Sequence, residues 1–250
     1  MPVLLVVPAR VGSTRLPNKP LQPLGGAPLV ARVIERAREV PGVDRLVLAT
    51  DSPAIADALT EWHVETILTA TFHESGTDRV AEVAALPGFA SYDIVVNLQG
   101  DEPFMPAEAV AGAIRRVRGG DAIGTAAAPL DPAQRDDPAR VKVVCNARGH
   151  ALYFSRSAIP HVRDVADFEG TRWWQHLGVY AYRRDTLLQI TTLRVGELER
   201  SERLEQLRAL AAGFEIGVAL LDHPADSGID TPADLAAAES RWRELAEVTR

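Results

Sequence analysis

Short, uninterrupted apolar runs alternate with helical patterns through the first 130 residues, and this alternation constrains the fold more than any other feature. The runs, such as Val3–Val7, lack the polar alternation of a strand with one face in water, so both faces should be buried. In the following segment Leu29, Val33 and Ile34 fall on one side of an expected helix, as packing on a sheet requires. The pattern predicts an α/β fold, a Rossmann-like and mostly parallel sheet flanked by helices.

The individual elements follow from the same patterns. In the first half we expect strands at 3–7, 45–49, 65–68, 94–98 and 123–127, and helices at 29–39, 54–62, 77–85 and 107–117. In the second half we expect strands at 142–146, 150–154, 176–182 and 214–221, with helices at 202–212 and from Thr231 onwards. Asn146–Gly149 separates the first two of these strands as a hairpin turn would. We therefore predict one domain, residues 1–250, with a β-hairpin insertion.

Composition excludes several other classes of protein. The chain of 250 residues is 46% hydrophobic and 24% charged, which is ordinary for a globular protein. No apolar run approaches the roughly 20 residues of a membrane helix, and Val3–Val7 is too short for a signal peptide, so we expect a cytoplasmic protein without membrane association. The net charge of −7 argues against a nucleic-acid partner, which normally meets a basic surface. The single cysteine, Cys145, lies in an apolar run and is expected in the core.

The chain between Pro8 and Pro28 is a long connection between a strand and a helix, and long loops of this kind are usually functional. Its glycine and hydroxyl groups can face phosphate oxygens, while its cations supply countercharge. The residues concerned are Arg10, Gly12, Ser13, Thr14, Arg15 and Lys19. Neither a Walker A loop nor a Rossmann glycine motif is present. The functional interpretation is that this loop binds phosphate groups, and the alternative is that it is an ordinary basic surface loop.

Two acidic residues are candidates for binding a metal. Asp101 follows the most apolar run of the chain, so it should lie at the carboxyl end of a strand, where open α/β sheets bind ligands. A carboxylate there can hold Mg²⁺, which prefers oxygen ligands and bridges to phosphate. Asp230 stands directly before a helix. Either residue could instead be a turn residue or a helix cap, and the sequence does not show that the two meet.

Other candidates could read a base or a sugar acid. Ser75, Gly76 and Arg79 precede or open a helix and could contact a flat base, although the same segment would serve as a helix cap. Arg156 has the planar fork that matches a carboxylate. His176 and Tyr180 are four residues apart along an expected strand and therefore share a face. Packing or surface roles are the alternative for each.

Together these segments resemble the CMP-Kdo synthetases, a branch of the nucleotide-sugar cytidylyltransferases. The resemblance covers nearly the whole chain in order, beginning with Pro8–Leu21 (PARVGSTRLPNKPL). The other matching segments are Ala49–Asp51, Ser75–Arg79, Asn97–Pro103, Val141–Val143, Ala151–Arg156, His176–Tyr180, Leu204–Arg208 and Gly228–Pro232. The opening loop is shared with related sugar nucleotidyltransferases, whereas the later segments point to the Kdo branch. The stretch from His161 to Trp174 matches poorly, and we transfer no function to it.

The resemblance implies a fold of the nucleotide-diphospho-sugar transferase type and a specific reaction. The anomeric hydroxyl of 3-deoxy-D-manno-octulosonate (Kdo) would attack the α-phosphate of CTP, giving CMP-Kdo and pyrophosphate for lipopolysaccharide synthesis. It assigns the triphosphate to Arg10, Ser13, Arg15 and Lys19, of which Arg10, Arg15 and Lys19 would be catalytic. It assigns cytidine to Ser75, Gly76 and Arg79, and the Mg²⁺ cofactor to Asp101 and Asp230. It assigns the sugar acid to Gln99, Arg156, His176, Tyr180, Glu205 and Gln206. It also implies a homodimer, with about 130–200 carrying the sugar side and the dimer contact.

Two other functions stay open at this point. One is a CMP-sugar synthetase for a sialic acid or an amino-Kdo, which would share the nucleotide segments. The other is a non-catalytic nucleotide-binding protein on the same fold, which would be expected to lose charged residues such as Lys19, Asp101 and Asp230, all present here.

Overall fold

The computed structural model describes residues 1–12 and 15–248, and the chain separates into two compact units. The terminal unit combines Pro2–Ala107 with the chain from Asp226 onwards. The central unit contains Glu108–Ala225, together with Met1. The expectation that residues 1–250 act as a single domain stays a prediction.

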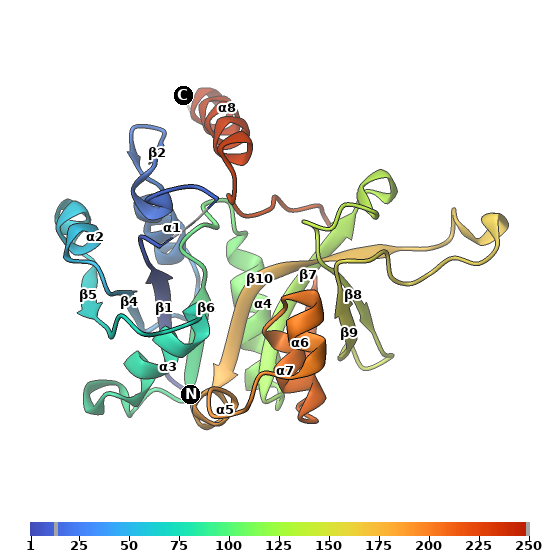
Figure 1. The fold of residues 1–250 in the computed structure, drawn as a ribbon, viewed down its shortest axis with the longest axis horizontal. Helices are drawn as coiled ribbons and strands as arrows, with labels where there is room; N and C mark the ends of the chain where they lie inside the picture. The colour runs from blue at the N-terminus through green and yellow to red at the C-terminus, as the bar shows by residue number, and fades with distance from the viewer. Residues whose placement is uncertain (13–14, 249–250) are drawn as a thin grey trace. The chain divides into compact units, whose positions relative to one another are not determined.

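The terminal unit holds a parallel sheet with the order β6-β1-β4-β5. Its strands are β1 (Val3–Ala9), β4 (Arg45–Thr50), β5 (Glu65–Leu68) and β6 (Ile94–Leu98), and its first helices are α1 (Leu29–Arg38), α2 (Pro53–Ala58) and α3 (Gly76–Ala85). All seven residues of β1 are buried, as the uninterrupted apolar run predicts. Right-handed crossovers put α1 and α2 on one face of the sheet and α3 on the other (Figure 1). The strand order reverses between β1 and β6, and this switch point is where such sheets bind ligands.

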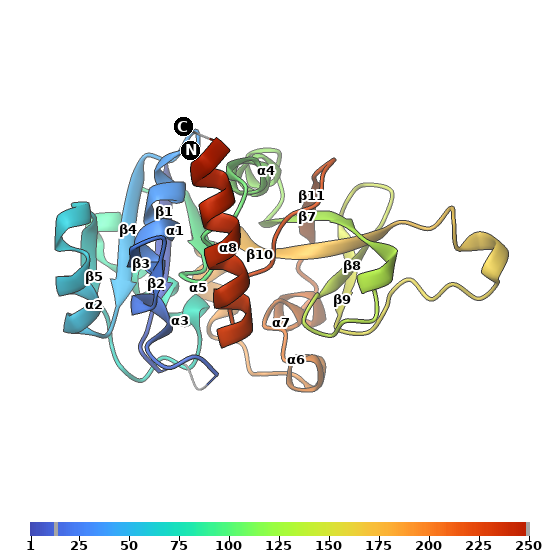
Figure 2. The ribbon, with the colours of Figure 1, turned by 90° about the horizontal axis from the view of Figure 1, so that it is seen from above.

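The C-terminal part of this unit is a long helix, α8 (Pro232–Val248), which lies beside α1 and the two-strand hairpin β2–β3 (Figure 2). The hairpin strands are β2 (Pro23–Leu24) and β3 (Ala27–Pro28). Trp242 of α8 packs against the hairpin at Gly25, where a Cβ atom would lie 2.2 Å from the indole nitrogen. Gly25 also has a φ of 55°, so both the contact and the turn require glycine.

The central unit holds a mixed sheet. β11 pairs with β7 in parallel, whereas β7, β10, β8 and β9 pair in antiparallel fashion. Its strands are β7 (Ile123–Leu130), β8 (Lys142–Cys145), β9 (Ala151–Ser155), β10 (Trp173–Arg183) and β11 (Ile216–Leu220), and its helices are α4 (Ala107–Arg118), α5 (Arg184–Ile190), α6 (Glu197–Glu202) and α7 (Gln206–Ala211). The predicted turn at Asn146–Gly149 joins β8 to β9, with Gly149 at a φ of 74°.

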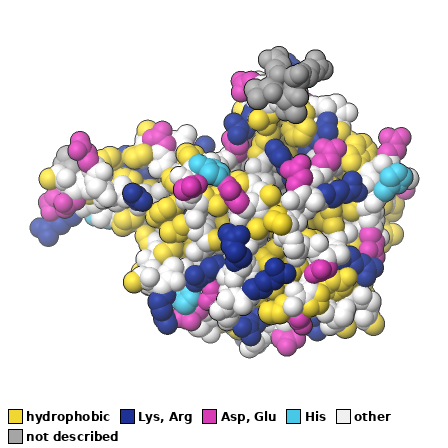
Figure 3. All heavy atoms as spheres, turned by 180° about the vertical axis from the view of Figure 1, so that it is seen from behind, with side chains coloured by type: hydrophobic (Ala, Val, Ile, Leu, Met, Phe, Trp, Pro, Cys, Tyr) yellow, Lys and Arg dark blue, Asp and Glu magenta, His cyan; other side chains and the backbone are white. Residues whose placement is uncertain are grey.

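On the face shown in Figure 3, cationic side chains lie among anionic ones.

Two expected helices are wrong in extent, and two helices, α5 and α6, were not expected. The helix predicted at 202–212 is instead the shorter α7, which is separated from α6 at Arg203, whose φ is 54°. The break is stabilised from outside, because the Arg156 guanidinium binds the main-chain oxygen of Glu202 at 2.8 Å. The helix predicted at 54–62 ends at Ala58 and continues as a 3-10 turn. α5 has no side-chain cap at its N-terminus, so the sequence there lacks the capping residue that would predict the start of a helix.

Candidate active site

Lys19 lies between two carboxylates at the switch point of the terminal unit. Its ammonium donates to Asp101 Oδ2 and, at 2.9 Å, to Asp230 Oδ1. Arg15 adds a second cation, with Nη2 3.0 Å from Asp230 Oδ2. The Lys19 side chain is 14% exposed, and those of Asp101 and Asp230 are 28% and 44% exposed. The structure therefore brings together four of the predicted residues, from three distant parts of the sequence.

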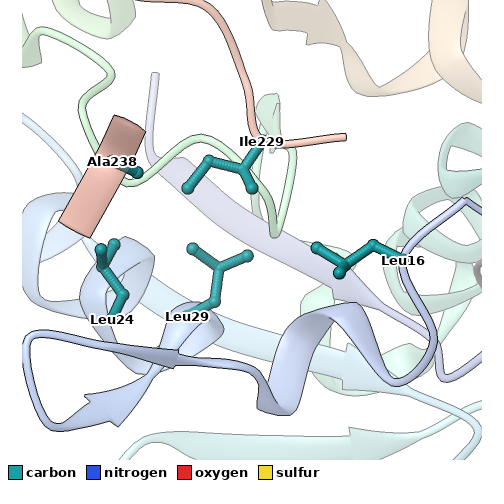
Figure 4. Close-up of a cluster of buried hydrophobic side chains, with 5 residues drawn as sticks. All are labelled: Leu16, Leu24, Leu29, Ile229 and Ala238. Atoms are coloured by element: carbon teal, nitrogen blue, oxygen red, sulfur yellow. The ribbon is translucent and has the colours of Figure 1, made fainter. Parts of the chain in front are cut away.

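A backbone hydrogen bond and a small hydrophobic cluster hold these residues close together. Asp101 follows β6, and its main-chain oxygen accepts from the Ile229 amide at 3.0 Å, which places Asp230 beside it. The Ile229 side chain is buried with Leu16 and Leu29 (Figure 4). Leu16 belongs to the opening loop, so the cluster holds that loop and the Asp230 segment together. The full cluster is Leu16, Leu24, Leu29, Ile229 and Ala238.

The alternative interpretation of Asp230 as a helix cap is excluded by its neighbour. Thr231 caps α8, because its Oγ1 accepts from the Asp234 amide at 3.2 Å. Asp234 in turn accepts from the amides of Asp230 and Thr231. The carboxylate of Asp230 is thereby left to the two cations of the opening loop.

In this cluster the two cations Lys19 and Arg15 face the two carboxylates of Asp101 and Asp230. Burial opposes the charge of Lys19, but Asp101 and Asp230 together raise its pKa. The adjacent Glu102 has a pKa raised well above its usual range, by burial first and then by the negative charges of Asp101 and Asp230. Among residues 1–12 and 15–248, no group of three or more acidic, histidine or cysteine side chains is placed to hold a metal. Two carboxylates are the donor set expected for Mg²⁺, which takes its other oxygens from water and phosphate.

Three predicted segments converge at the carboxyl end of β1. A Cβ atom on Gly76 would lie 3.1 Å from Gln99 Oε1 and 3.3 Å from Pro8 Cγ. A Cβ atom on Gly100 would lie 2.8 Å from the main-chain oxygen of Pro8. Gln99 is held by its amide nitrogen, which donates to Asn97 at 3.1 Å. Gly100 is thus required by close approach of the main chain, whereas the tight packing at Gly76 places the proposed cytidine segment next to the opening strand.

Ser75 and Arg79 both have structural partners within the terminal unit. Ser75 caps α3 and exchanges hydrogen bonds with Asp78, so the capping interpretation of this segment is confirmed. The Arg79 side chain is 2% exposed and binds Asp51 at 2.8 Å, together with Thr69. The expectation that Arg79 presents its guanidinium to a base is corrected, because that group is buried and supports the chain around Thr69.

The remaining nucleotide-side predictions concern the opening loop. Ser13 lies outside the described residues. Arg10 is exposed, and within the described part of the chain it forms no ion pair. An exposed cation on this loop remains available to an anionic ligand.

The sugar-side residues predicted from the sequence lie in the central unit, except for Gln99. On β10 the rings of His176 and Tyr180 lie 5.3 Å apart, and Phe154 of β9 contacts His176 edge-on at 4.9 Å. Burial lowers the pKa of His176 to about 3, so the imidazole is neutral. The Tyr180 hydroxyl has a pKa raised well above its usual value, chiefly by burial. Glu205 is exposed at the start of α7, whereas the Gln206 amide nitrogen is buried without a partner among the described residues.

Arg156 is engaged with the backbone. Its guanidinium binds the main-chain oxygens of Pro138 at 2.9 Å and Glu202 at 2.8 Å. The expected free guanidinium fork is therefore corrected to one that joins three segments of the central unit. Lys142, which the sequence analysis did not select, donates to the main-chain oxygens of Asp137 and Arg156. A lone lysine inside an apolar run was the signal for it, since a buried lysine needs partners.

The low pKa of His176 predicts acid sensitivity. The unfolded state takes up a proton near pH 6.5, whereas the folded state does so only near pH 3, so protonation favours unfolding between these values. We expect the free energy of unfolding to fall by up to about 1.4 kcal/mol per pH unit below pH 6.5 on this account. Urea unfolding of the wild type and His176→Phe at pH 7, 6 and 5 measures the effect. The variant should lose less stability, and His161→Gln, at an exposed histidine, should behave as wild type. Equal slopes for all three proteins would contradict the prediction.

The sheet and its acid–lysine cluster define the class: an α/β protein whose charged side chains gather at the switch point, where such sheets bind their ligands. Residues 4–216 match the cytidylyltransferase family. A 3-deoxy-manno-octulosonate cytidylyltransferase from Gemmatimonas aurantiaca is 49% identical over 98% of this chain and 96% of its own length. One from Polynucleobacter necessarius subsp. necessarius is 46% identical over 93% and 92%. The chain belongs to the cytidylyltransferase family, as the sequence resemblance predicted.

Solved structures agree with this membership. The structure of CMP:2-keto-3-deoxy-manno-octonic acid synthetase in complex with CTP matches with a TM-score of 0.90, at 39% identity over 98% of this chain and 99% of that one. The 4-diphosphocytidyl-2C-methyl-D-erythritol synthase of Anaerococcus prevotii matches with a TM-score of 0.63 at 11% identity, which is a likeness of fold alone. The predicted α/β class with a mostly parallel sheet is thus confirmed.

Proposed function

We propose that the chain transfers CMP from CTP to the anomeric hydroxyl of Kdo, releasing pyrophosphate and supplying CMP-Kdo for lipopolysaccharide synthesis. The observation that carries this proposal is the Lys19–Asp101–Asp230 cluster at the switch point of a cytidylyltransferase fold. The names of the two curated relatives, and of the CTP-bound synthetase, support CTP and Kdo as the substrates.

The nucleotide side follows from the cluster. Nucleotidyl transfer depends on positioning and on stabilising charge more than on covalent help from the protein. Arg10, Arg15 and Lys19 would hold the triphosphate, and Lys19 would offset charge as pyrophosphate leaves. Mg²⁺ on Asp101 and Asp230 would supply further positive charge at the phosphates. Ser13 is assigned to the triphosphate through the family resemblance. Gly76, which lies beside Gln99, would contact the cytidine, as the family resemblance implies.

The sugar side rests on the aromatic surface of β10 and on α7. His176 would be a neutral hydrogen-bonding group, because a protonated imidazole is disfavoured there. The unpartnered amide nitrogen of Gln206 could donate to a sugar oxygen. Gln99, Arg156, Tyr180 and Glu205 complete the proposed set, with Arg156 acting mainly by fixing the segments around it.

A homodimer and a cytoplasmic location are also part of the proposal. The homodimer rests on the family resemblance, which places the contact with a second copy of the chain in the part that includes the β8–β9 hairpin. In the described residues no helix is both long enough and apolar enough to cross a membrane.

A substrate panel tests the proposal. The enzyme is incubated with CTP, MgCl₂ and one of three sugar acids: Kdo, an amino-Kdo or a sialic acid. We expect pyrophosphate release with Kdo and at least about tenfold lower kcat/KM with the others, since lost or unpaired hydrogen-bonding groups cost specificity. Preference for another sugar acid would favour the rival synthetase. CTP binding without pyrophosphate release in all three mixtures would indicate a non-catalytic nucleotide-binding protein.

A further inference from the structure

Thr125 of β7 is fully buried, and its hydroxyl lies near two polar atoms of β10, a main-chain carbonyl oxygen and a histidine ring nitrogen. Its Oγ1 is 2.7 Å from the main-chain oxygen of Val179 and 3.0 Å from Nε2 of His176. The β7–β10 register shifts between Leu177 and Tyr180, and the Val179 carbonyl lies within this irregular stretch. Thr125 therefore satisfies a carbonyl at the irregularity and contacts the predicted sugar-side histidine at the same time.

The direction of each hydrogen bond follows from the chemistry of the partners. A carbonyl oxygen can only accept, so the single hydroxyl hydrogen of Thr125 is donated to Val179. The hydroxyl oxygen then has only lone pairs left for His176. Nε2 of His176 must carry the hydrogen of that contact, since two acceptors cannot share a hydrogen bond.

A neutral imidazole carries one N–H group, so a hydrogen on Nε2 leaves Nδ1 as an acceptor. The lowered pKa of His176 agrees with the neutral form. No residue in the described part of the chain forms a hydrogen bond with Nδ1, and the residue is half-buried, so a ligand hydroxyl can use this nitrogen. The rings of Phe154 and Tyr180 pack against the imidazole and limit its rotation.

We propose that Thr125 is a positioning residue that holds His176 as the Nε2–H tautomer, so that Nδ1 accepts a hydrogen bond from a hydroxyl group of the sugar acid. The proposal rests on the proposed function in one respect, the contact of His176 with the sugar. It adds two points to that function. Thr125 is the residue that sets the tautomer of His176, and the sugar must offer a hydrogen-bond donor to Nδ1. A sugar derivative with an ether in place of that hydroxyl would present no donor to Nδ1.

The test compares three variants with the wild type. Thr125→Val removes the hydroxyl at nearly constant shape, and Thr125→Ser restores it. Thr186→Val makes the same chemical change at another buried threonine of the central unit, on α5. Long-range ¹H–¹⁵N NMR reads the tautomer of each histidine at pH 7.5, and His176→Ala identifies the His176 signals among the six histidines. Steady-state pyrophosphate release gives the KM values for Kdo and for CTP separately.

We expect Nε2–H in the wild type, in Thr125→Ser and in Thr186→Val. In Thr125→Val a buried Nε2–H would lack its acceptor, so the hydrogen should move to Nδ1. The KM for Kdo should then rise about tenfold while the KM for CTP changes less than about twofold, and Thr125→Ser should recover the wild-type value. A general loss of structure would instead change both KM values together.

Two results would overturn the inference. One is an Nδ1–H tautomer in the wild type, a result that does not depend on the folding of any Thr125 variant. The other is a Thr125→Val enzyme with unchanged tautomer and unchanged KM for Kdo, while His176→Ala raises that KM. An unaffected KM for Kdo in His176→Ala would contradict the proposed sugar contact itself, and the spectra would still decide the role of Thr125 in setting the tautomer.

Discussion

Replacing Lys19 with alanine should lower turnover by more than a hundredfold while leaving the fold intact. The ammonium is bound by two carboxylates from separate segments, and in the proposed reaction it stabilises charge on the departing pyrophosphate. Losing one preorganised charge contact of this kind costs about 2.7–4 kcal/mol of barrier, which corresponds to a factor of about 10²–10³. The fold should survive, because Asp101 and Asp230 keep access to water and the backbone contact from Ile229 to Asp101 does not involve Lys19.

The measurement is steady-state pyrophosphate release, with thermal unfolding followed by circular dichroism. Arg36→Ala is the matched control, since it removes a cation from an ion pair with Glu39 in the same unit, on helix α1. That control should retain activity within about twofold, as exposed ion pairs contribute little. Near-normal turnover of the Lys19 variant would contradict the assignment, whereas a large fall in the melting temperature would point to a structural role.

Replacing Asp101 with alanine should also reduce turnover by more than a hundredfold. The loss has two sources: a proposed ligand of Mg²⁺ disappears, and Lys19 loses one of its two carboxylate partners. These two sources of lost turnover can be separated by measuring activity at different concentrations of MgCl₂. If Asp101 binds the metal, the concentration of Mg²⁺ for half-maximal activity should rise by about tenfold or more in Asp101→Asn, which retains the shape of the side chain.

Removal of Mg²⁺ from the wild type with excess chelator should abolish turnover, and added MgCl₂ should restore it. Asp57→Ala, at an exposed acid on α2, should keep both the turnover and the Mg²⁺ dependence of the wild type. An unchanged Mg²⁺ dependence in Asp101→Asn would contradict a metal-binding role for Asp101, even if the variant were slow.

The sequence was most informative where structure depends on local patterns. The strand Ile94–Leu98 was predicted with its observed bounds, because four of its five residues are apolar and both of its faces are buried. Its position also predicted a ligand site at Asp101, since the carboxyl ends of such strands are known binding positions. The meeting of Asp101 with Asp230 could not be predicted from patterns, because it depends on a backbone contact between segments more than 100 residues apart.

Errors arose where distant side chains decide local structure. The Arg203 break depends on the guanidinium of Arg156, which no window around residues 202–212 contains. Arg79 has the same spacing in the sequence whether it faces a ligand or a buried Asp51, so only the structure distinguishes the two. Thr125 lies in an alanine-rich strand and becomes notable only because the main-chain carbonyl of Val179, at an irregularity in the neighbouring strand, accepts a hydrogen bond from it.

The Ile229–Leu16 contact has a consequence for the order in which the protein is made. The strands and first helices of the terminal unit leave the ribosome early, but Ile229 and Asp230 are synthesised only after the whole central unit. Because domains generally begin to fold during synthesis, the central unit can form while Leu16 lacks Ile229 and Lys19 lacks one carboxylate partner. The proposed phosphate site is therefore completed last, and a nascent chain that stalls before residue 229 cannot assemble it.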